Sequence, residues 1–88
     1  MVMEVNMDEV LQLMDEIIQD PSVPRNIRSA VSDAKDLIQK KEGDRALNFT
    51  QAIYILDEAA NDVNIPLHTR TQIWSLISAL ESIKESLK

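Results

Sequence analysis

Apolar residues recur every three or four positions along almost the whole chain, which is the period of an amphipathic α-helix. They form four successive stripes separated by polar and proline-containing segments. The first two stripes consist of Met7, Val10, Leu11, Met14, Ile17 and Ile18, and of Ile27, Ala30, Val31, Ala34, Leu37 and Ile38. The last two consist of Phe49, Ala52, Ile53, Leu56 and Ala60, and of Ile73, Leu76, Ile77, Leu80, Ile83 and Leu87. The pattern predicts an all-α protein with four helices.

The ends of the first two helices carry recognisable signals. Asn6 followed by Glu9 is typical of a helix N-terminus, where the Asn side chain accepts a backbone N–H. The first helix should end before Asp20, because a residue that precedes proline is pushed out of the α region. We expect Pro24 in the first turn of the second helix, where its missing N–H costs nothing. Gly43, after two lysines, predicts a left-handed cap that ends this helix.

The second half of the chain repeats the first at an offset of 42 positions. We expect the third helix to open at Asp44 or Asn48 and the fourth near Pro66. Residues 6–38 aligned on 48–80 share these identities: Asn6/Asn48, Asp15/Asp57, Glu16/Glu58, Asp20/Asp62, Pro24/Pro66 and Arg28/Arg70. Each copy reads as one αα-hairpin, and two copies are fewer than a stacked repeat array needs. The sequence therefore predicts a single domain, residues 1–88, folded as a four-helix bundle of two hairpins.

The repeated turn has the form D-x-[SN]-[VI]-P-x-x-x-R. In an antiparallel hairpin the acid should lie near the arginine and near the N–H groups that open the second helix. We interpret the motif as a structural clamp rather than a functional site, because a turn is needed twice and a site rarely is. The clamp residues are Asp20, Pro24 and Arg28 in the first hairpin, and Asp62, Pro66 and Arg70 in the second.

Composition limits the classes of function. The 88 residues include no cysteine and one glycine. The net charge is −6, and all of the excess negative charge falls within residues 1–24. An acidic face repels phosphate backbones, so nucleic-acid binding there is not expected. The first residues lack the basic and apolar regions of a secretory signal, and no apolar run reaches the length of a membrane span. We therefore expect a cytoplasmic protein that does not bind membranes.

Candidate chemistry is sparse. Carboxylate pairs recur at Asp15 and Glu16 and 42 positions later, but helical-wheel geometry directs Glu16 and Glu58 toward solvent. The single histidine, His68, has no acid three positions earlier, as the carboxylate-and-histidine metal sites of helical bundles require. One glycine cannot build a phosphate-binding loop. We therefore expect no catalytic residue, no metal and no cofactor, and hence no enzyme.

The features that do not repeat are better candidates for a function. Trp74 lies at the flank of the fourth apolar stripe, and Leu47 and Tyr54 lie on a second face of the third helix. Apolar groups on a second face indicate either a central helix or a contact surface. Both interpretations stay open from the sequence: these side chains are buried within the chain, or they bind a second copy or another protein. Tyr and Trp are residues that interfaces favour.

An alternative function uses the basic residues of the second helix. An accessory role in a nucleoprotein complex would place phosphate groups against Arg25, Arg28, Lys35, Lys40 and Lys41. Acidic residues of the same helix and the acidic first helix dilute that patch, so we favour a protein-interaction module.

The stretches "PSVPRNIR", "AIYILDEAAND" and "IPLHTRTQIWSLISALE" allow a comparison with known proteins. Across residues 7–83 the chain resembles an archaeal family of small, acidic, uncharacterised helical proteins. The resemblance implies a compact four-helix bundle in an archaeal cytoplasm. It implies no activity, substrate or site residue.

Overall fold

The computed structural model describes residues 6–87, and its four helices account for most of them. They are α1 (Met7–Ile18), α2 (Arg25–Gln39), α3 (Arg45–Ala60) and α4 (Leu67–Ser86). No strand occurs among the described residues, so the predicted all-α class is confirmed. Glu4, which contributes to the acidic N-terminal segment, lies outside the described range.

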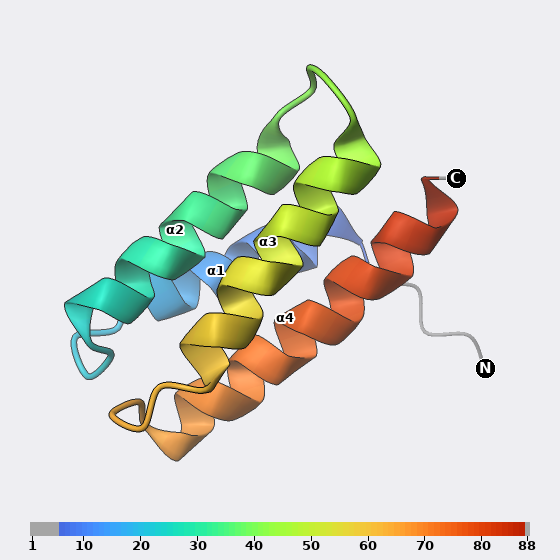
Figure 1. The fold of residues 1–88 in the computed structure, drawn as a ribbon. Coiled ribbons are helices and arrows are strands. Elements are labelled where there is room, and N and C mark those ends of the chain that lie inside the picture. Colours follow the sequence, from blue (N-terminus) through green and yellow to red (C-terminus); the bar gives the residue numbers. More distant parts are fainter. Residues whose placement is uncertain (1–5, 88) are drawn as a thin grey trace.

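The helices pack as a ring of four. In Figure 1, α2, α3 and α4 run side by side and α1 lies behind them. Helix α1 contacts α2 and α4, and α3 contacts the same two helices from the other side. The α1–α2 and α3–α4 turns lie at one end of the molecule, and the α2–α3 connection lies at the opposite end (Figure 1). The predicted four-helix bundle is therefore the observed architecture.

Side-chain caps begin the first and third helices. The Asn6 side chain accepts a hydrogen bond from the Glu9 N–H at 2.9 Å, as predicted. Asp44 does the same for the Leu47 N–H at 3.2 Å, so α3 opens after Asp44 and not at Asn48. An oxygen acceptor at this position satisfies one of the free N–H groups of the first turn.

Two boundaries differ in detail from the sequence-based expectation. Pro24 and Pro66 stand at the N-cap, one residue before the first helical turn, with φ of −54° and −60°. Gly43 has the expected left-handed conformation, with φ of +77°, but α2 ends earlier, at Gln39. Gly43 therefore bends the connection just before α3 and does not cap α2, because Lys40 already adopts an extended conformation.

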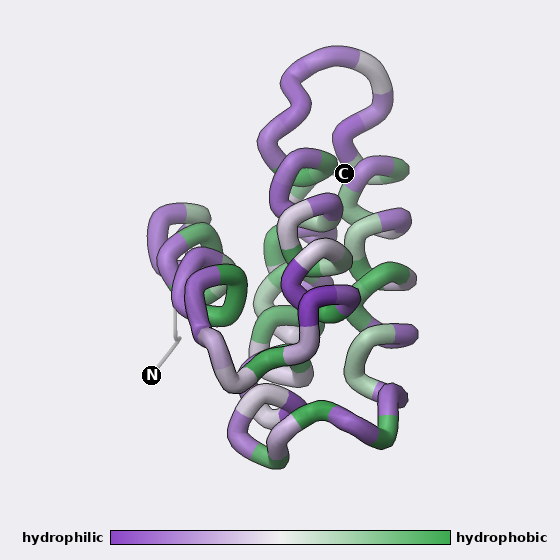
Figure 2. Tube along the Cα trace, turned by 90° about the vertical axis from the view of Figure 1, so that its left-hand side faces the viewer, coloured by the Kyte–Doolittle hydropathy of each residue, from purple (hydrophilic) through white to green (hydrophobic). Residues whose placement is uncertain are grey.

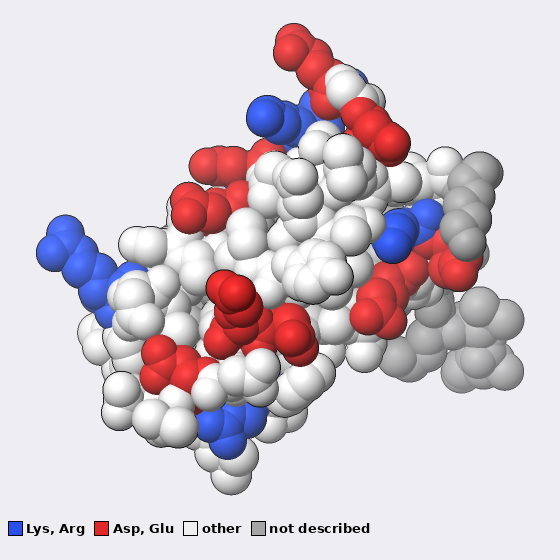
Figure 3. Space-filling view, viewed as in Figure 1, with Lys and Arg blue, Asp and Glu red and all other residues white. Residues whose placement is uncertain are grey.

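Polar and apolar residues separate cleanly in this arrangement. Hydrophobic and hydrophilic stretches alternate along each helix, and the α2–α3 connection is hydrophilic (Figure 2). On the face that α2, α3 and α4 share, charged groups stand out from the surface and leave uncharged areas between them (Figure 3). This is the distribution expected when each helix turns one stripe toward a common core.

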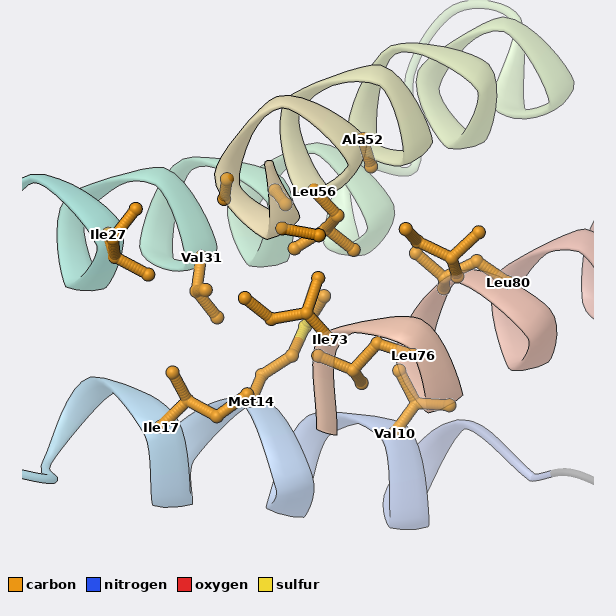
Figure 4. Packing of buried hydrophobic residues seen from close by; sticks show 14 of the residues in the cluster. Val10, Met14, Ile17, Ile27, Val31, Ala52, Leu56, Ile73, Leu76 and Leu80 are labelled. Carbon is orange, nitrogen blue, oxygen red and sulfur yellow. The ribbon is translucent and has the colours of Figure 1, made fainter. Parts of the chain in front are cut away.

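The core is aliphatic and draws on all four helices. Figure 4 shows Met14 of α1 reaching toward Ile73 of α4, with Leu56 of α3 above them. Phe49 is the one aromatic residue in the core and is fully buried. Val23 and Ile65, one in each turn, are also buried and close the end of the core. Thr69 is the one buried polar residue among those described, and its hydroxyl has no hydrogen-bond partner.

Candidate interaction surface

A groove runs between the outer faces of α3 and α4. Its volume is about 740 Å³, and all the residues that line it belong to these two helices. Ile53 of α3 and Ile77 of α4 are among them, and both are largely covered by their neighbours. The groove exists because residues spaced three and four apart on each helix share a face. The two isoleucines line it together with small polar side chains such as Thr50 and Ser78.

Two of the three residues singled out from the sequence meet in this groove. Tyr54 is 70 % exposed and Trp74 is 47 % exposed, and both line the groove. Leu47 is 52 % exposed, but it lies outside the lining. Of the two interpretations left open from the sequence, burial within the chain is thus wrong for all three side chains. Two large aromatic side chains are held beside the same apolar depression.

Carboxylates accompany the aromatic residues. Asp57, Glu81 and Glu85 line the groove together with one cation, Lys84. Asp57 and Glu81 are exposed, and neither makes a hydrogen bond or ion pair with another described residue. Figure 3 shows acidic side chains flanking an uncharged stretch of surface over α3 and α4. Sequence reasoning did not assign these acids to the site, although Asp57 follows Tyr54 by three positions and so shares its helical face.

The α1–α2 and α3–α4 turns, which lie at the same end of the bundle, have the same construction. Asp20 accepts the Ser22 N–H at 2.9 Å, and Asp62 accepts the Asn64 N–H at 2.8 Å. The carbonyl of each following proline, Pro24 or Pro66, accepts two N–H groups of the helix that it opens. A short polar side chain that bonds the backbone two residues ahead is a common way to hold a tight turn.

The arginines of the turn motif do not pair with its acids, which corrects the expected clamp. Arg70 donates from Nε to the Ala60 carbonyl at 3.1 Å and from a terminal nitrogen to the Asp62 carbonyl at 3.2 Å. Arg28 makes no hydrogen bond with the described residues, and its Nε is buried. The C-terminal carbonyls of a helix are good acceptors for a cation, so Arg70 bonds the backbone at the end of α3.

The turn acids instead reach across the bundle. Asp20 lies 3.2 Å from the His68 ring of the other hairpin, and Asp62 accepts a hydrogen bond from Asn26 at 3.2 Å. His68 and Asn26 occupy equivalent places, two positions after the proline of each turn. Hydrogen bonds from the Ser22 side chain and N–H, and then from His68, lower the pKa of Asp20. The turn acids therefore hold the two hairpins together at this end.

The basic residues of α2 do not form one surface. Lys35 is bound to Asp15 of α1 by a 2.6 Å ion pair, which neutralises it. Arg28 is half-buried. Arg25 and Lys40 lie at opposite ends of the helix, roughly 22 Å apart at 1.5 Å per residue. The described residues therefore present no continuous basic strip to a phosphate backbone.

Groupings of side chains that could hold a metal ion do not occur in the described part of the chain. No three histidine, cysteine or acidic side chains within residues 6–87 lie close enough to hold a metal ion. Glu16 and Glu58 are both exposed, and His68 is engaged with Asp20. None of the helices in the same range is long and apolar enough to cross a lipid bilayer.

The fold and the groove together define a small four-helix protein with an exposed aromatic surface. The chain belongs to UPF0147, an uncharacterised protein family whose model matches residues 2–83. This confirms the resemblance to an archaeal family with no known activity.

Relatives from archaea match almost the whole chain. A UPF0147 protein of Methanocaldococcus jannaschii is 52 % identical over 85 % of this chain and 81 % of its own length. One from Pyrococcus furiosus is 44 % identical over 92 % of this chain and 88 % of its own. A crystal structure of a UPF0147 protein from Thermoplasma acidophilum superposes with a TM-score of 0.82, at 38 % identity, covering 86 % of this chain and 89 % of that one.

Proposed function

We propose that this chain is a non-enzymatic protein-interaction module that binds through the groove between α3 and α4. One observation carries the proposal: Tyr54 and Trp74 both project beside an apolar depression, with 70 % and 47 % of their surfaces exposed. Soluble monomers rarely leave contiguous apolar area uncovered without a use for it. Tyrosine and tryptophan are also the side chains that dominate binding energy at protein interfaces.

The remaining exposed apolar groups are arranged differently. Val63 lies in the α3–α4 turn and Leu67 opens α4, and neither lines the groove. Single exposed apolar side chains of this kind are normal on protein surfaces. They provide a control for the hydrophobicity of the surface as a whole. Leu47 is exposed outside the groove, and it shares the helical face of Tyr54 because it precedes Tyr54 by seven positions.

The test is affinity capture from an extract of an archaeon that has a family member. The tagged protein and two double variants serve as baits. Tyr54→Ala with Trp74→Ala should lose its specific partner, while Val63→Ala with Leu67→Ala should retain it. The purified partner should then bind wild type and control alike in calorimetry. Equal capture by all three baits would refute the proposal. The nucleoprotein alternative would be favoured instead by a partner that is lost on nuclease treatment but is captured equally by wild type and by the Tyr54 and Trp74 variant.

A further inference from the structure

We infer that the occupant of the α3–α4 groove is a cationic amphipathic helix of another protein. The inference rests on the proposed function and specifies the partner's chemistry. Three features carry it: the shape of the groove, the charges along it and the net charge of this chain.

The shape of the groove suits a helix. Its α4 wall runs from Trp74 to Glu85, which is about 16 Å of helix at 1.5 Å per residue. A partner helix of about three turns spans that length. Amphipathic helices bind such grooves by inserting apolar side chains spaced three and four apart. Ile53 and Ile77 would contact that apolar stripe.

The charges along the groove favour a partner of positive charge. Three carboxylates and one ammonium group line it. Asp57 and Glu81 have no partner within residues 6–87, so both are available to a lysine or arginine of the incoming helix. Tyr54 and Trp74 add a second attraction, because the faces of aromatic rings bind cations. A polynucleotide is disfavoured at the same place, because its phosphates would meet these carboxylates.

The same charges argue against a second copy of this chain. A two-fold contact through the groove would bring each residue against its own counterpart or neighbours. Six carboxylates would then share one interface with two ammonium groups, by doubling the three and one that line each groove. Like charges placed together at an interface oppose association. Each copy also carries a net charge of −6.

Trp74 is the only tryptophan of the chain, so its fluorescence reports occupation of the groove directly. The probes are two synthetic helical peptides of about 14 residues, roughly 20 Å long, with the same leucine stripe. One carries lysine and arginine on its polar face and the other carries glutamate. The cationic peptide should shift Trp74 emission to the blue and bind more weakly as salt rises. The glutamate peptide should leave the emission unchanged.

Substitutions separate this inference from the proposed function. Asp57→Asn with Glu81→Gln should weaken binding of the labelled cationic peptide roughly fivefold, as expected for two exposed ion pairs. Asp33→Asn with Asp36→Asn removes the same charge from the exposed side of α2 and should change binding little. Tyr54→Ala should weaken binding at least about fivefold, the loss typical of an interface aromatic.

Each other outcome has a definite meaning. If Tyr54→Ala weakens peptide binding but Asp57→Asn with Glu81→Gln does not, the interaction surface is supported and the cationic character of the partner is refuted. A cationic partner is also refuted if the glutamate peptide binds equally well. The same holds if the α2 control variant loses as much affinity for the cationic peptide as the groove variant does. No binding of the cationic peptide at low salt overturns the inference. Self-association at low salt that depends on Tyr54 would assign the groove to a second copy.

Discussion

The Asp20 carboxylate shows how much one side chain can do in a small bundle. It accepts the Ser22 N–H and hydroxyl within its own turn, and it lies against His68 of the other hairpin. These hydrogen bonds stabilise the charged form and hold the pKa of Asp20 below its ordinary value of 3.8. A carboxyl whose pKa is lower when folded contributes stability above its unfolded pKa, and that contribution is lost as pH falls through its folded pKa.

At acidic pH the wild type should therefore no longer be more stable to unfolding than Asp20→Asn. We expect Asp20→Asn to lower the urea midpoint at neutral pH, because asparagine carries no charge for these partners to stabilise. The difference from wild type should persist down to about pH 4 and narrow below it. Urea titrations at neutral pH, near pH 4 and near pH 2.5 measure it, with Asp33→Asn as the control for the loss of one exposed charge. A difference that stays constant into acid would contradict this account.

The two motif arginines give a matched comparison at the same scale. Arg70 bonds two carbonyls at the end of α3, whereas Arg28 leaves its buried Nε without a partner. Losing hydrogen bonds from a charged group costs about 1.5–3 kcal/mol, while removing a buried polar group that has no partner can be neutral or stabilising. Arg70→Met should thus destabilise the protein more than Arg28→Met, by about 1–2 kcal/mol in chemical denaturation. Equal losses would show that both arginines act through packing alone.

At the scale of one helix, α3 carries two aromatic residues with opposite roles. Phe49 is fully buried and Tyr54, five positions later, is largely exposed. Truncating a buried phenylalanine leaves a cavity and costs about 3–5 kcal/mol. A surface substitution away from such contacts usually changes stability by less than about 0.5 kcal/mol. The core face and the groove face of α3 are therefore separable by mutation.

We expect Phe49→Ala to lower the melting temperature steeply or to prevent folding, and Tyr54→Ala to leave it nearly unchanged. Thermal unfolding followed by circular dichroism measures both. The pair also serves as the folding control for the binding experiments, since they require Tyr54→Ala to fold normally. A large stability loss from Tyr54→Ala would show that the ring supports the α3–α4 packing.

Helices and core could be predicted from the sequence because both depend on local patterns. Asn6 marks the start of α1, and Asp20 before a proline marks the limit of its end, each through its own backbone chemistry. The spacing of the apolar residues predicts which face of each helix is buried. The buried residues of α1 are Val10, Met14 and Ile17, as expected. Thr69 was missed because it is polar, although it occupies the place of Ile27 in the first hairpin.

The contacts between elements could not be predicted in the same way. The sequence placed Asp20 beside Arg28 because both belong to one turn, but the packing of the hairpins brings it to His68, 48 positions away. The groove acids were missed for a related reason. Asp57 was considered as part of a carboxylate pair with Glu58, and only the position of α4 shows that Asp57 and Glu81 share one surface. Side-chain partners across a bundle depend on how its helices pack.

At the scale of the whole molecule, net charge decides which associations are favourable. This chain carries −6 overall and an acidic groove, so two copies repel each other both at long range and at the proposed surface. Exposed charges are screened over about 10 Å at 0.1 M salt and over about 3 Å at 1 M. Contacts between copies through the aromatic residues should therefore become less unfavourable as salt rises, whereas binding of a cationic helix should weaken.

Sedimentation equilibrium across a salt series tests this directly. At low ionic strength we expect the 10.0 kDa monomer, because repulsion between like-charged copies is then least screened. Any association at high salt should disappear in Tyr54→Ala with Trp74→Ala, because burial of these two rings is what would favour it. A stable dimer at low salt that survives this double substitution would place self-association on a different surface. It would leave the groove free for a partner while showing that the overall negative charge does not keep the chain monomeric.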